Sequence, residues 1–97
     1  MPAAPLAKRS FIPNEKLQHI ARETMSAHFL RHRNMGATRA SGPEEFYGFR
    51  PEDVAEIFLH KHGFGRGVWF RLKDGRVIDV RGKPSEPDRA WYVTSAH

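Results

Sequence analysis

The sequence predicts a small α+β domain in which two helices pack on one face of a three-stranded antiparallel sheet, in the order αα-βββ. Apolar residues recur at helical spacing in the first sixty residues, whereas from residue 68 onward they alternate with polar residues as in strands. A chain of 97 residues is long enough for one domain with a modest core. Because it has no cysteine, the chain has no disulfide framework, thiolate metal site or nucleophilic thiol.

The N-terminal residues 1–13 show neither a helical nor a strand period, and we interpret them as a flexible basic arm that carries Lys8 and Arg9. The single domain then occupies residues 14–97.

The first helix is predicted from about Glu15 to Arg33, because Asn14 is suited to cap a helix and apolar residues follow at helical spacing. These apolar residues are Leu17, Ile20, Ala21 and Met25. Residues 34–42 contain two glycines and show no period, so they are predicted to form a loop.

A second helix is predicted from about Pro51 to His62. Proline suits the first helical position, and Glu52 and Asp53 follow at the positive end of the helix dipole. Its expected buried stripe is Val54, Ile57 and Phe58.

A hairpin is predicted from strands at residues 68–72 and 76–81, and the turn between them sets its register. A two-residue Asp-Gly loop would mix apolar and charged residues on one face, so a three-residue loop with Gly75 in the left-handed conformation is favoured. That register gathers the apolar side chains Val68, Phe70, Leu72, Ile78 and Val80 on one face. A third strand is predicted at residues 90–94.

The net charge of +5 is unevenly distributed along the chain. Residues 1–42 carry +5, residues 43–62 carry −3, residues 63–83 carry +4 and residues 84–97 carry −1. No apolar run approaches the length of a membrane span or of a secretory signal, so we expect no membrane partner and a cytoplasmic location.

The first candidate site is the outer face of the predicted sheet, where Trp69 lies beside Arg71 and Arg81, with Tyr92 as a further member. Bases can stack on such an aromatic while the guanidinium groups pair with phosphates. The alternative is a tryptophan covered by arginine side chains or by the N-terminal arm.

A second candidate is the basic segment Arg31, Arg33 and Arg39, joined by Lys8 and Arg9 of the arm. Flexible arginine-rich segments bind phosphate backbones without sequence preference, although a solvated helix end has the same composition.

The glycine-rich connector at residues 63–67 is expected to expose Phe64, which its glycines hold out, and Arg66, which we add to the predicted contact residues. It follows a predicted helix and precedes a strand, which is the reverse of the order in phosphate-binding loops, so we interpret it as a turn.

The six histidines give no familiar metal-ligand spacing, so neither a metal nor a cofactor is predicted. A histidine with nearby arginines could serve a small ribonuclease. However, no nucleophile or second base is placed beside one, so no enzymatic activity is assigned.

Two functions therefore remain from the sequence. The first is non-sequence-specific binding of RNA or single-stranded DNA through the sheet face and the basic segments. The second is a protein-interaction module that meets an acidic protein surface or forms a homodimer, with the acidic second helix of one chain against the basic hairpin of another. The acidic residues on that helix disfavour it as a DNA-reading helix.

Overall fold

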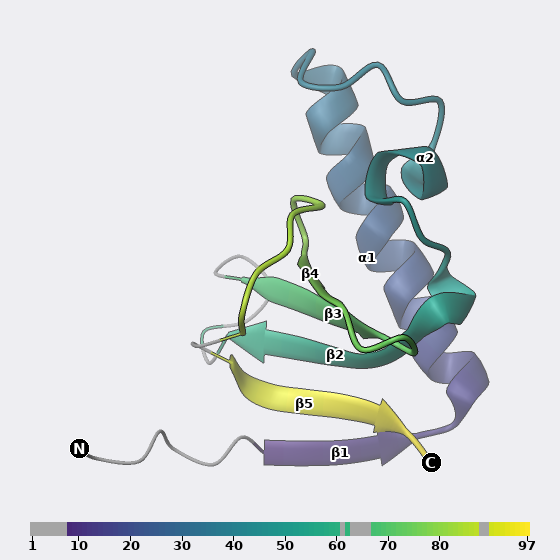
Figure 1. Cartoon of the computed structure of the whole chain (residues 1–97), viewed down its shortest axis with the longest axis vertical. Coiled ribbons are helices and arrows are strands. Elements are labelled where there is room, and N and C mark those ends of the chain that lie inside the picture. The colour runs from purple at the N-terminus through teal and green to yellow at the C-terminus, as the bar shows by residue number, and fades with distance from the viewer. Residues whose placement is uncertain (1–7, 61, 63–66, 88–89) are drawn as a thin grey trace.

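One face of a five-stranded mixed sheet is covered by a single long helix (Figure 1). The computed structural model describes residues 8–60, 62, 67–87 and 90–97. The elements in chain order are β1 (Lys8–Ile12), α1 (Asn14–Asn34), α2 (Pro43–Tyr47), η1 (Pro51–Asp53), β2 (Val54–His60), β3 (Val68–Leu72), β4 (Val77–Asp79) and β5 (Ala90–Ala96). The strand order is β1-β5-β2-β3-β4, with β1 parallel to β5 and the other pairs antiparallel. The prediction of a three-stranded antiparallel sheet beneath two packed helices is therefore wrong.

The predicted second helix is the source of the largest error, because its residues form the short 3₁₀ turn η1 and then the central strand β2. Two features of β2 imitate helical spacing. A bulge at Ala55 puts both Val54 and Ile57 on the helix-covered face, three residues apart. Phe58 is buried on the opposite face, so the strand also has a buried residue at the next position. The 3₁₀ turn retains a favourable start, since the Asp53 side chain accepts a hydrogen bond from the Arg50 amide at 2.9 Å.

Part of the predicted N-terminal arm forms a strand. β1 lies along β5 with Lys8 opposite Tyr92 and Ile12 opposite Ala96, so the first and last strands of the described chain are side by side (Figure 1). Ile12 packs against the main core. Residues 1–7 lie outside the described residues.

The first predicted helix is confirmed as α1, one residue longer at each end than expected. Its N-cap is Pro13, whereas Asn14 lies within the helix. α1 packs Leu17, Ala21 and Met25 against the sheet, where they are at most 1% exposed. Among the described residues, no helix is long and apolar enough to span a membrane.

The unpredicted helix α2 and the residues just after it complete the core with aromatic side chains. The rings of Tyr47 and Phe49 lie 6.0 and 5.8 Å from that of Phe70, both in edge-on arrangements. The Tyr47 hydroxyl donates a hydrogen bond to the Val80 carbonyl, and burial with the negative charge of Asp79 raises the pKa of this phenol. Gly48 caps the C-terminal end of α2, and its φ of 80° is the left-handed conformation that glycine tolerates.

The β3–β4 hairpin has the predicted register. Phe70 pairs with Ile78, the Leu72 amide donates to the Arg76 carbonyl at 2.8 Å, and Gly75 has a φ of 96°. The apolar residues assigned to one face, Val68, Phe70, Leu72, Ile78 and Val80, all pack in the main core with α1.

Candidate functional site

The face of the sheet that α1 leaves uncovered, called here the outer face, carries most of the charged side chains of the sheet. Strand register assigns Arg9 and Phe11 of β1, Val93 and Ser95 of β5, Glu56 and Phe58 of β2, Trp69 and Arg71 of β3, and Val77 and Asp79 of β4 to this face.

Four of these residues form a polar row across four adjacent strands, called here the carboxylate row: Arg9, Ser95, Glu56 and Arg71. The Glu56 Oε2 atom accepts hydrogen bonds from Arg9 Nη1 at 3.0 Å and from Ser95 Oγ at 2.7 Å. Its Oε1 atom lies 3.2 Å from Arg71 Nε. One carboxylate thus holds two guanidinium groups that come from strands three positions apart in the sheet.

The charge of Glu56 is set by competing effects. Partial burial raises the pKa of this carboxyl group, but hydrogen bonds from Ser95 and Arg9 and the positive charges of Arg71 and Arg9 outweigh it. The net pKa lies below the ordinary value of 4.5, so Glu56 is ionised at neutral pH.

Exposure differs between the carboxylate and its partners. The Glu56 side chain is 17% exposed, whereas those of Arg9 and Arg71 are 55% and 45% exposed. A ligand in solvent can therefore reach both guanidinium groups without first unfolding any element. The row carries two positive charges and one negative charge, which leaves one net positive charge for an anion.

An exposed aromatic lies beside the row. Phe11 pairs with Ser95 in the β1–β5 register and is 61% exposed. Of the large hydrophobic residues that the structure describes, Met35 alone is more exposed. Arg71 also lies over an aromatic ring, with its guanidinium carbon 5.3 Å from the centroid of Phe58.

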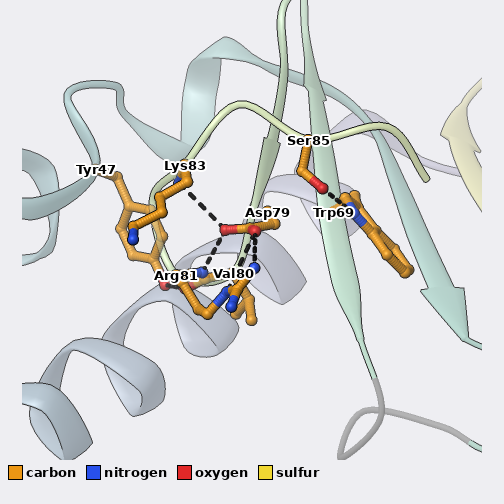
Figure 2. A network of polar contacts seen from close by, with 7 residues as sticks. All are labelled: Tyr47, Trp69, Asp79, Val80, Arg81, Lys83 and Ser85. Atoms are coloured by element: carbon orange, nitrogen blue, oxygen red, sulfur yellow. Dashed lines mark hydrogen bonds and ion pairs between the residues drawn. The ribbon is translucent and has the colours of Figure 1, made fainter.

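Trp69, predicted as the stacking residue, lies in a second apolar cluster on the outer face with Phe58 and Val93 and is 7% exposed. Its indole N–H donates a hydrogen bond to the Ser85 hydroxyl at 3.2 Å (Figure 2). Gly67 approaches it so closely that a Cβ there would lie 2.8 Å from the ring. Trp69 is therefore a packing residue of this face.

Arg81 forms its contacts within the loop after β4, with the carboxylate of Asp79. Asp79 accepts hydrogen bonds from the Arg81 and Lys83 amides at 2.9 and 3.1 Å, and the Arg81 guanidinium pairs with the same carboxylate at 2.9 Å (Figure 2). The side chain of Arg81 is nevertheless 68% exposed.

The remaining predicted residues do not join the carboxylate row. Tyr92 pairs with Leu59 and so lies on the helix-covered side of the sheet, where it is 38% exposed. Arg31 and Arg33 belong to the C-terminal end of α1 and Arg39 to the loop beyond it, at the opposite end of the molecule from β1 (Figure 1). Arg66 lies outside the described residues.

Sequence reasoning missed Glu56 and Ser95 and placed Arg9 in a different site. The signal for Glu56 was a single carboxylate within the apolar run of residues 54–59, which is informative once that run is treated as a strand. Among the residues that the structure describes, no three histidine or acidic side chains are grouped closely enough to hold a metal ion.

Comparisons with protein-family models, with curated proteins and with solved structures found no match.

Proposed function

We propose that the chain binds single-stranded nucleic acid on the outer face of its sheet, with Arg9 and Arg71 contacting phosphates and Phe11 stacking on a base. The observation that carries this proposal is the convergence of two half-exposed guanidinium groups on one carboxylate beside an exposed phenylalanine. Guanidinium groups match phosphate oxygens in geometry, and aromatic rings accept any base.

The proposal revises the stacking platform suggested by the sequence. Phe11 takes the role first given to Trp69, because Trp69 is buried and Phe11 is exposed. Arg71 keeps its predicted role, and Arg9 contributes from a strand edge. Contact through phosphates and a single stacking ring implies little readout of base edges, in agreement with the expectation of non-sequence-specific binding.

One form of the alternative function, a homodimer in which the acidic second helix of one chain meets the basic hairpin of another, loses the feature that favoured it. Residues 54–60 form a strand, and the acidic residues near them have partners within the chain. Glu52 pairs with Arg22 at 2.8 Å and Asp53 with the Arg50 amide. Glu56 pairs with Arg9 and Arg71 of the carboxylate row.

The test is binding of short labelled single-stranded RNA and DNA, followed by fluorescence anisotropy between about 50 and about 200 mM salt. For single strands, each phosphate contact contributes about −0.7 to the slope of log affinity against log salt. Two contacts therefore predict about −1.4 from the row, and Arg9→Gln or Arg71→Gln should each reduce the magnitude of the slope by about 0.7.

Arg22→Gln is the matched control, because Arg22 also forms one ion pair but lies on α1, away from the outer face. It should leave the slope unchanged. Affinity that is independent of salt, or equal loss in all three variants, would contradict the proposal.

A further inference from the structure

We propose that the carboxylate row cleaves RNA by transesterification, with Glu56 as the general base that accepts the 2′-hydroxyl proton and with Arg9 and Arg71 holding the scissile phosphate. This inference rests on the proposed nucleic-acid binding and goes beyond it by assigning a reaction and a substrate class.

The geometry supplies the required groups within one site. Glu56 lies between the two guanidinium groups, with Arg9 Nη1 3.0 Å from one carboxylate oxygen and Arg71 Nε 3.2 Å from the other. A phosphodiester that bridges the two arginines is therefore held over the carboxylate. Because a ribose 2′-oxygen is bonded within two atoms of its 3′-phosphate oxygen, a bound phosphate brings that hydroxyl to Glu56.

The reaction balances without a further co-reactant. The 2′-hydroxyl gives its proton to the Glu56 carboxylate as the 2′-oxygen attacks phosphorus. The new O2′–P bond forms and the P–O5′ bond breaks. The products are a 2′,3′-cyclic phosphate and a 5′-hydroxyl, whose oxygen takes a proton from solvent water. The hydroxide left by that water takes the proton from Glu56, which restores the carboxylate. The two guanidinium groups stabilise the extra negative charge that develops on the phosphoryl oxygens.

Substrate binding also makes Glu56 a stronger base. In the free protein, contacts with Arg9 and Arg71 help to keep the pKa of Glu56 low, while partial burial acts in the opposite direction. A phosphate that draws the two arginines to itself weakens those contacts and leaves the effect of burial in place. The pKa of Glu56 then rises toward the range in which a carboxylate accepts a proton efficiently.

Ser95 is a positioning residue in this scheme. Its hydroxyl donates to Glu56 Oε2 at 2.7 Å, and Ser95 is only 8% exposed, so this buried neighbour fixes the position of the carboxylate within the row. It keeps one hydrogen bond to Glu56 when the arginines turn to the phosphate.

The experiment incubates the full chain with a short mixed-sequence RNA labelled at its 5′ end and with the DNA of the same sequence. We expect cleavage of the RNA to fragments that end in a cyclic phosphate, and binding of the DNA without cleavage, since DNA lacks the nucleophile. Glu56→Gln, shown to be folded by circular dichroism, should bind RNA with at least wild-type affinity and cleave it at least about 100-fold more slowly.

Glu52→Gln is the matched control, because it removes one carboxylate that pairs with an arginine away from the outer face. Its cleavage rate should equal that of the wild type. Equal rates in the wild type and Glu56→Gln would show that a contaminant cuts the RNA and would overturn the inference.

The experiment can refute the binding proposal and the cleavage proposal independently. RNA that binds with the predicted salt slope and remains intact would overturn the cleavage proposal while the binding proposal stands, whereas the absence of binding would overturn both. If Glu56→Gln does not fold, Ser95→Ala decides the case. Loss of its hydrogen bond raises the pKa of Glu56, so the acid limb of the cleavage rate should move to higher pH, and an unmoved limb would contradict the role of Glu56.

Discussion

Glu56 is a carboxylate on the central strand of the sheet, and its surroundings support both a structural role and the chemical role proposed above. Two arginines and a serine from three other strands converge on it. Cross-strand polar contacts of this kind stabilise a solvent-facing sheet modestly, since exposed ion pairs contribute little each. The same contacts preset two guanidinium groups for an anion, which is the property used in the proposed function.

Protonation of Glu56 should destabilise the fold, and the sign follows from the direction of its pKa shift. The folded-state pKa lies below the ordinary value of 4.5, so the stabilisation from Glu56 is present above that pH and is lost as pH falls through the folded-state pKa. We therefore expect the free energy of unfolding of wild type, measured with urea between about pH 5 and pH 2, to fall more steeply than that of Glu56→Gln.

Ser95→Ala provides a graded comparison in the same experiment. It removes one of the contacts that lower the pKa of Glu56, so its pH dependence should lie between those of wild type and Glu56→Gln. Parallel curves for all three proteins would show that the row contributes no pH-dependent stability.

At the scale of elements, local patterns predicted the elements that local contacts determine. The helical spacing of Leu17, Ala21 and Met25 identified α1, and the turn chemistry of Gly75 identified the hairpin register. β2 was misassigned because its bulge and its burial on both faces produce a helical spacing. β1 was missed because its pairing partner is β5, at the other end of the chain, and no local signal reports such a contact.

The candidate site was predictable to the same extent. Arg71 followed from the hairpin, whereas its convergence with Arg9, Glu56 and Ser95 depends on the two strands that the sequence did not reveal. Trp69 was assigned to the correct face, but the sequence did not show that Ser85 and Gly67 would enclose it.

β1 offers a test that separates a strand from a mobile arm. Ile12 is half-buried against the core, so Ile12→Ala should lower the free energy of unfolding by about 1–2 kcal/mol, less than the loss for a fully buried isoleucine. Its neighbour Phe11 is 61% exposed, so Phe11→Ala should change stability by less than about 0.5 kcal/mol.

In nucleic-acid binding we expect the reverse, with a larger loss of affinity in Phe11→Ala than in Ile12→Ala. Loss of the stacking ring in Phe11→Ala should weaken binding of single-stranded RNA by about 1–3 kcal/mol, measured by anisotropy at fixed salt. A mobile arm would instead leave the stability of Ile12→Ala equal to that of wild type in chemical unfolding.

At the scale of the whole molecule, two basic regions that could contact an anionic strand lie apart from one another. One is the carboxylate row at the β1 side of the sheet, and the other is the C-terminal end of α1 with Arg31, Arg33 and the following Arg39 (Figure 1). The molecule is 42 Å along its longest axis, so one short oligonucleotide distinguishes the two regions by where it binds.

The most direct test of this account is therefore an NMR titration of the backbone amides with a short single-stranded RNA, performed on Glu56→Gln so that the RNA stays intact. We predict that the largest shift changes occur at Arg9, Phe11, Arg71 and Ser95, with little change at the C-terminal end of α1. Shift changes confined to Arg31, Arg33 and Arg39, with an unperturbed carboxylate row, would contradict the assignment of the outer face as the nucleic-acid site.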